Sequence, residues 1–462
     1  MGHSKDLLLG RLRNGTPLTG GEQLRLTLLL AVPAILAQFS AVLMQYIDAA
    51  MVGRLGANPA AAIGLVTPSS WLLYGFSMSV TTGFAVQVAH ACGARDFHRA
   101  RQVLREGLTT VFLFSMLLGL LGCLGAAPLP RWLGGEAAIR DEASAYFRIF
   151  SIFLPVSATG YAASAMLQSS GNMKVPSILF IGMCALDVVF NYVFIYLLDW
   201  GVAGAAWGSG VAEALTSGVA VWYATTREKD LRIIGEKGRF RPSRATLKTA
   251  MGITGPLWFQ NIVMRGSYVA STLIVAPLGA IAIAANAFAI TAESFCYMPG
   301  YGLEEAATTL VGQSLGAKRK DLARRFAWTT VGMGVGIMSL MGIALFLFAR
   351  PLMALLTHDP DVIALGAECL RIEAFAEALY AVSIVGFGVC AGAGNTLVPT
   401  CLNFGSIWLV RIVLGIILTP KLGLTGYWIA MCIELNIRGL LFFFYIKGKR
   451  WLQKSIPLPA GP

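Results

Sequence analysis

Residues 31–56 read AVPAILAQFSAVLMQYIDAAMVGRLG, a long apolar run with a proline near its start and one acid, Asp48, in its second half. A hydrocarbon core of about 30 Å needs about 20 apolar residues in a helix, so this run can span a bilayer. A carboxylate inside such a span costs about 2.5–3.5 kcal/mol on insertion scales and usually faces a cavity or a partner. We therefore expect a proton, a sodium ion or a cationic substrate to compensate Asp48.

The composition of the whole chain agrees with this interpretation. Of 462 residues, 56% are hydrophobic and only 13% are charged, whereas a soluble chain carries about a quarter charged residues. The chain is thus predicted to be a polytopic helical membrane protein. Lys and Arg number 36 against 24 acids. We attribute this excess to membrane topology and expect no nucleic-acid partner.

Several classes of function lack their motifs. The eight cysteines show no CxxC or Cys/His metal spacing, so we interpret them as small core residues. There is no Walker A motif, no HExxH motif and only four histidines, which gives no support for an enzyme or for a cofactor. The N-terminal MGHSKDLLLGRLRNG lacks the pattern of a secretory signal and is interpreted as a short basic cytoplasmic lead.

Apolar runs bounded by charges or by Gly, Pro and Asn clusters predict twelve spans. They lie near residues 24–52, 63–89, 103–127, 142–168, 175–197, 203–224, 249–278, 281–311, 326–349, 365–392, 398–419 and 425–446. Counting residues at span ends with the adjacent connection, 26 of the Lys and Arg residues lie on the side of the two termini and seven on the other side, with three inside spans. The positive-inside rule places both termini in the cytoplasm.

The two halves of the chain are related by an internal repeat. One offset, 223 positions, relates several matching pairs: Gly56 and Gly279, Gly93-Ala94 and Gly316-Ala317, Arg101 and Arg324, Gly171-Asn172 and Gly394-Asn395, and Pro176 and Pro399. A single offset held over more than a hundred residues indicates duplication. We predict an all-α membrane protein with twelve transmembrane helices in two parallel six-helix repeats around a central cavity. The halves are 1–226 and 249–462, the second ending in a basic cytoplasmic tail, and a cytoplasmic linker, 227–248, joins them.

These motifs resemble one transporter family. MVGRLGANPAAAIGL after the first span, LVGQSLGAKRKDLARR after the eighth, and the paired SGNMKVPS and GAGNTLVPT resemble the MATE (multidrug and toxic compound extrusion) transporters over essentially the whole chain. The resemblance implies export of amphipathic, often cationic compounds, driven by inward H⁺ or Na⁺.

The best candidate for a cation site lies in the N-terminal half. MATE transporters often carry an acid in the first span, where Asp48 lies; the alternative is a salt bridge from Asp48 to Arg54 at the outer interface. Asp187 and Asn191 in span five are at i and i+4 on one helical face. The family commonly has Asn first and Asp or Asn second, so this chain departs from the family's order. Ser209 in span six stands where the family often has Ser or Thr.

Together Asp48, Asp187, Asn191 and Ser209 are predicted to bind the coupling cation, a proton or an Na⁺ ion held by the first three. Carboxylate, amide and hydroxyl oxygens all suit a hard cation. Two carboxylates in one dry cavity repel, which favours retention of a proton on one of them. The alternative for Asn191 and Ser209 is helix-to-helix hydrogen bonding alone.

Candidate substrate contacts are Tyr46, Gln260, Glu293, Glu304 and Glu305. The NorM-like branch of the family uses a Glu in span seven where this chain has Gln260, which cannot carry a proton. That difference favours the DinF-like branch. Glu304 and Glu305 point about 100° apart on a helix; one is expected to pair with Arg265 and the other to line the cavity.

The remaining acids within spans have other expected roles. Glu373 and Glu377 are expected to be solvated near the outer end of span ten. Glu434 lies four residues before Arg438, which favours a structural ion pair. Arg411 in span eleven is also expected to be structural.

Together with the spans and the repeat, the resemblance to MATE transporters implies a monomeric, multi-pass inner-membrane antiporter that exports amphipathic small molecules by alternating access. Two alternatives stay open. One is a flippase for a lipid-linked precursor, which would have a strongly cationic cavity. The other is a channel or receptor without ion coupling.

Overall fold

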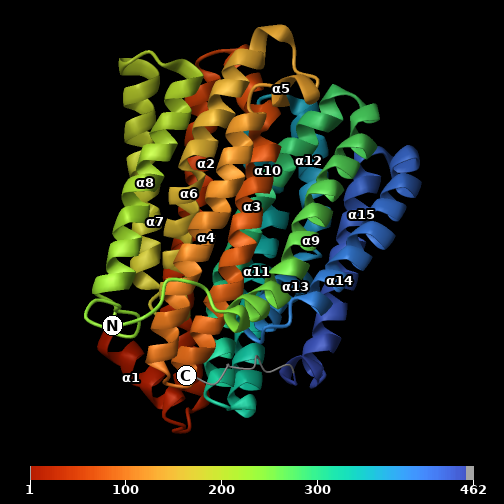
Figure 1. Cartoon of the computed structure of the whole chain (residues 1–462). Coiled ribbons are helices and arrows are strands. Elements are labelled where there is room, and N and C mark those ends of the chain that lie inside the picture. Colours follow the sequence, from red (N-terminus) through yellow and green to blue (C-terminus); the bar gives the residue numbers. More distant parts are fainter. Residues whose placement is uncertain (1, 454–462) are drawn as a thin grey trace. The chain divides into compact units, whose positions relative to one another are not determined.

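The computed structural model describes residues 2–453, and all regular secondary structure within that range is helical (Figure 1). Met1 and residues 454–462, most of the predicted tail, lie outside the described residues. In chain order the helices are α1 (Gly2–Arg13), α2 (Gly20–Gly53), α3 (Ala57–Gly93), α4 (Phe97–Gly125), α5 (Leu129–Trp132), α6 (Ala137–Ser169), α7 (Lys174–Tyr192), η1 (Val193–Leu197), α8 (Gly201–Thr226), α9 (Arg244–Val275), η2 (Ala276–Leu278), α10 (Ala280–Gly316), α11 (Lys320–Leu356), α12 (Pro360–Glu373), α13 (Glu377–Gly392), α14 (Leu397–Ser406), η3 (Ile407–Ile412), α15 (Val413–Lys447) and η4 (Arg450–Leu452).

Each of the twelve predicted spans lies on one helix or on consecutive helical segments, and the helices extend up to seven residues beyond the predicted ends. By length and hydropathy alone, eight helices can cross a membrane, and nine if α12 and α13, which meet at 63°, count as one bent span. The stretch 397–447 passes as one apolar helix but holds two predicted spans, which meet at the non-helical Gly423. The two remaining predicted spans correspond to α8 and α9, which do not pass this test of length and hydropathy. All twelve predicted spans are helical, which confirms the predicted helical membrane fold.

The repeat is visible in the backbone. Positive φ angles occur in pairs separated by the predicted offset or by one position less: Gly56 and Gly279, Arg95 and Lys318, Gly171 and Gly394, and Gly201 and Gly423. Gly56 (φ 118°, ψ 178°) and Gly279 (φ 93°, ψ 175°) directly precede α3 and α10. Only glycine adopts this backbone conformation readily, so the duplicated glycines have a structural cause.

Contacts divide the described chain into two compact units. Among the described residues, the N-unit runs from Ser40 to Trp258, and the C-unit comprises residues 2–39 together with residues 259–453. The boundaries of the two units fall inside α2 and α9, so the units differ from the predicted halves, 1–226 and 249–462. The two halves remain a prediction from the sequence repeat.

Each unit has its own apolar core. In the N-unit α6 packs against α3, α4 and α8, around buried residues such as Phe84, Leu104 and Met166. In the C-unit α10 packs against α11, α12 and α13, around buried residues such as Ala289 and Trp428. These cores hold the polar side chains described below at fixed helical positions.

The segments at the expected cytoplasmic side are well anchored. Thr19 and Glu22 form a capping box at the start of α2: Thr19 N donates to Glu22 Oε2 at 2.8 Å, and Glu22 N donates to Thr19 Oγ1 at 3.3 Å. In the N-unit the linker predicted at 227–248 packs on α4, where Glu236 pairs with Arg101 and the Arg239 carbonyl accepts from Gln102 at 2.7 Å. The linker is thus a docked segment.

Candidate functional site

The predicted cation ligands of the N-terminal half come together in the N-unit. The Asn191 amide donates to Asp48 Oδ1 and to Asp187 Oδ2, both at 3.1 Å. Asp187 and Asn191 are 1% and 2% exposed, and Asp48 is half-buried. The carboxyls of Asp48 and Asp187 also interact electrostatically with each other. Since two carboxylates repel, this geometry requires a shared proton or a cation.

Close packing of α8 on α7 positions Asn191. A Cβ atom on Gly208 would lie 2.1 Å from Asn191 Oδ1 and 2.8 Å from its backbone nitrogen. One turn earlier, a Cβ on Gly204 would lie 2.7 Å from the Phe194 carbonyl. Glycines four residues apart let two membrane helices approach closely. The GAAWGSG segment therefore fixes the site by lacking side chains at 204 and 208.

The donor set fits a proton or a small hard cation. Ser209, next to Gly208, approaches the Asp187 carboxylate. Asp187 Oδ1 and Asn191 Oδ1 are buried, and neither has a hydrogen-bond partner among residues 2–453. Buried acceptors left without donors are costly, and a proton or an Na⁺ ion would satisfy both. Two carboxylates, an amide and a hydroxyl supply oxygen ligands of the kind that hard cations prefer.

The alternative pairing of Asp48 does not occur. No ion pair joins Asp48 to Arg54 in the described part of the chain, and no lysine or arginine there pairs with Asp187. The carboxyl pair therefore has no cation of its own. That property separates it from an ordinary structural salt bridge.

Sequence reasoning missed two members of this cluster. Glu213 of α8 accepts a hydrogen bond from Ser157 and interacts electrostatically with Asp187. The Tyr146 phenol interacts with Asp48, Glu213 and Asp187. Glu213 could have been found, because it lies four residues after Ser209 and so shares its helix face. Tyr146, in α6, lies far from the others in sequence, and no spacing rule points to it.

The predicted substrate contacts lie at separate places. Tyr46 is half-buried on α2, in the N-unit. In the C-unit, Gln260 Oε1 accepts from Thr400 at 3.0 Å, and Glu305 Oε1 accepts from Gln38 at 3.1 Å. Glu304 is half-buried, whereas Glu293 is only 6% exposed. Glu304 interacts electrostatically with Glu305.

The expectation that Glu373 and Glu377 are solvated is wrong. Both side chains are 0% exposed. An acidic pair at i, i+4 normally marks a wet helix face, but here α11 covers it: a Cβ on Gly342 would lie 3.0 Å from the Glu377 Cβ. The missing side chain at 342 lets α11 enclose the acids.

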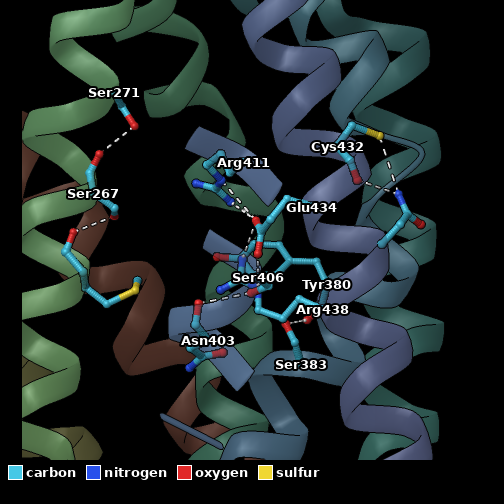
Figure 2. Close-up of polar contacts among 12 residues, drawn as sticks. Ser267, Ser271, Tyr380, Ser383, Asn403, Ser406, Arg411, Cys432, Glu434 and Arg438 are labelled. Atoms are coloured by element: carbon cyan, nitrogen blue, oxygen red, sulfur yellow. Dashed lines mark hydrogen bonds and ion pairs between the residues drawn. The ribbon is translucent and has the colours of Figure 1, made fainter. Parts of the chain in front are cut away.

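The expected Glu434–Arg438 pair is confirmed and is part of a larger triad. Figure 2 shows the Glu434 carboxylate between Arg411 and Arg438. Arg411 Nη2 lies 2.6 Å from Glu434 Oε2, and Arg438 Nε lies 3.1 Å from Glu434 Oε1. Glu434 is 0% exposed, and the Arg438 guanidinium also lies over the Tyr380 ring at 5.4 Å. Arg411, from η3, was expected to be structural, and its partner is Glu434.

Comparison with known proteins agrees with this arrangement. The MatE family model matches residues 33–193 and again residues 256–417. The chain belongs to the MatE family. The two matches begin 223 positions apart, which is the offset of the internal repeat. As a MATE chain it is a multi-pass membrane transporter and not an enzyme.

Relatives of this MATE chain cover nearly all of it. It is 27% identical over 435 residues to the probable multidrug resistance protein NorM of Chromobacterium violaceum, covering 90% of this chain and 92% of that protein. It is 27% identical over 448 residues to the multidrug resistance protein MdtK of Yersinia enterocolitica, covering 93% and 96%.

Solved structures share the fold. The Vibrio cholerae MATE transporter VcmN in the bent form gives a TM-score of 0.84 at 19% identity, over 94% of this chain and 98% of that chain. An outward-facing multidrug resistance MATE family transporter gives 0.85 at 20% identity, over 96% and 98%.

Proposed function

We propose that this MATE chain exports amphipathic, often cationic small molecules in exchange for inward-moving H⁺ or Na⁺. The multidrug resistance names of the relatives support drug export. The observation that carries the ion coupling is the Asp48–Asp187 carboxyl pair, bridged by Asn191 and without a basic partner among the described residues. Asp48, Asp187, Asn191 and Ser209 are the proposed ion ligands.

The mechanism follows from charge. With no ion bound, two close carboxylates in a poorly solvated site repel, so binding of H⁺ or of Na⁺ relieves a cost that is already present. A cationic substrate would relieve the same repulsion, so the substrate and the ion compete for the same carboxylate pair. Such competition yields exchange when access alternates between the two sides.

We infer that the DinF-like branch describes this chain better than the NorM-like branch. Gln260, which stands where NorM-like members have a Glu, is neutral and engaged with Thr400. The proton- or sodium-carrying role then falls to the N-terminal half. Tyr46, Gln260, Glu293, Glu304 and Glu305 remain proposed substrate contacts.

The flippase alternative calls for free positive charge inside the protein. Arg411 and Arg438 both pair with Glu434 instead. This pairing favours the handling of cations. We further propose a monomer in the inner membrane with both termini in the cytoplasm.

Transport in proteoliposomes with separately imposed pH and Na⁺ gradients tests the proposal. We expect a gradient to drive movement of a cationic dye by the wild type, and Asp48→Asn to lose at least tenfold in the initial rate because one carboxyl is gone. Asp141→Asn, an exposed acid on α6, is the matched control and should keep the wild-type rate.

Two results would contradict the proposal. Coupled transport that persists in Asp48→Asn would remove Asp48 from the ion site. Dye flux that ignores both gradients would favour a channel.

A further inference from the structure

Two glutamates flank the break between α12 and α13. Glu373 is the last residue of α12 and Glu377 the first of α13, and the two helices meet at 63°. Both side chains are 0% exposed, and none of their four carboxyl oxygens has a hydrogen-bond partner among residues 2–453. Buried polar atoms of this kind are nearly always paired in proteins, so something that the described residues do not supply must satisfy them.

The groups around these carboxyls come from every helix packed on the break. Those that interact electrostatically with Glu373 are Glu293 of α10, Arg411 of η3, and Glu434 and Arg438 of α15. Glu377 interacts with Glu373 and with Glu293. The nearby Tyr297, Tyr301 and Tyr380 form a chain of ring contacts at centroid distances of 5.9 Å. From α11 the break receives Gly342, which brings no charge.

The charges in this cluster do not balance when every group is ionised. Arg411 and Arg438 provide two positive charges, and both are placed on Glu434 (Figure 2). The cluster holds four carboxyls, those of Glu293, Glu373, Glu377 and Glu434, against these two guanidinium groups. Two carboxyls therefore have no cation. An unpaired charge in a dry interior is strongly disfavoured.

A proton fits this place better than a metal ion does. Among the described residues no group of three or more His, Cys, Asp or Glu side chains is arranged to hold a metal, and a hard cation needs several oxygens around it. Full burial leaves no room for an organic cation. A proton needs no coordination shell and converts a carboxylate into a neutral group.

We propose that Glu373 and Glu377 form a proton-binding site in the C-unit, distinct from the Asp48–Asp187 pair, which holds two protons while the break is enclosed. The Arg411–Glu434–Arg438 triad fixes α15 and η3 beside this site. The triad carries two positive charges and one negative charge, and the remaining carboxylate, Glu293, balances the excess positive charge. A change of bend between α12 and α13 would uncover the two acids and release their protons. The site goes beyond the ion exchange proposed above and does not depend on it.

Infrared absorption by protonated carboxyl groups tests this directly on the purified full chain in lipid nanodiscs at neutral pH. We expect Glu373→Gln and Glu377→Gln each to remove about one carboxyl's share of that absorption. Glu368→Gln, an exposed acid on α12, should remove none. An unchanged spectrum in both variants would overturn the proposal, as would loss of the wild-type absorption on adding NaCl at constant pH, which would identify Na⁺ as the ligand.

Thermal unfolding in the same nanodiscs provides an independent measurement. Gln has the shape of a neutral Glu, so Glu373→Gln and Glu377→Gln should unfold within about 2 °C of the wild type. Glu434→Gln removes the one carboxylate between two guanidinium groups and should unfold at a clearly lower temperature. If Glu373→Gln lowered the unfolding temperature as much as Glu434→Gln does, Glu373 would be an ionised partner and the proposal would fail.

Discussion

At the scale of single residues, one glycine in each unit determines how closely a neighbouring helix packs on the acids: Gly208 lies against Asn191, and Gly342 lies against Glu377. Asp48, Asp187 and Asn191 were recognisable because an acid within an apolar span is rare and because i, i+4 spacing places two side chains on one face. The burial of Glu373 and Glu377 was not recognisable. It depends on Gly342 of a different helix, and the spacing of an acidic pair does not reveal which helix covers it.

A substitution at Gly208 would test whether close packing holds the cation site. We expect Gly208→Ala to displace Asn191, because the new Cβ would lie 2.1 Å from its Oδ1. Asn191 would then no longer bridge Asp48 and Asp187, and ion-driven dye transport in proteoliposomes should fall at least tenfold while the protein stays folded. Gly218→Ala lies on the same helix with no atom near its Cβ and is expected to transport normally. Equal rates in the two variants would show that Asn191 does not depend on this contact.

At the scale of helices, the sequence predicted the number of spans and their duplication but not where a span bends. The twelve spans, the repeat offset and the glycines before α3 and α10 follow from hydropathy and spacing. The break at residues 374–376 was absent from the prediction, since a continuous apolar run reads as one helix whether or not it bends. The merging of two spans at Gly423 shows the same limit: hydropathy reports apolar length and not direction.

Alanine at the repeat glycines should destabilise both units alike. Gly56→Ala and Gly279→Ala place a Cβ in a backbone region that essentially only glycine occupies, at a cost of about 1–3 kcal/mol each. Thermal or denaturant unfolding in detergent would measure this. Gly64→Ala, inside α3 with open space around it, should be neutral or stabilising by about 0.5–1 kcal/mol. A destabilising Gly64→Ala together with neutral changes at Gly56 and Gly279 would contradict the backbone argument.

At the scale of the whole molecule, orientation follows from the distribution of basic residues. The excess on the side of the termini predicts a cytoplasmic linker between the halves. In a variant without native cysteines, Lys237→Cys in that linker should react with a membrane-impermeant maleimide only when the cytoplasmic face is open to the reagent. Trp132→Cys, in α5 and 74% exposed, should react in intact spheroplasts. Labelling of Lys237→Cys in sealed spheroplasts would reverse the orientation.

The division inside α9 has a consequence for biosynthesis. The N-unit closes only through residues after the linker: Thr254 donates to the Ser79 carbonyl and Trp258 to the Phe76 carbonyl, both at 3.1 Å. A ribosome that has released six membrane helices has therefore not yet made the last part of this core. The C-unit in turn incorporates the oldest part of the nascent chain, up to Phe39. The N-unit therefore lacks part of its core until residue 258 is made, so a gene split within the linker would yield two fragments that reach the native state only when they are co-expressed in one membrane.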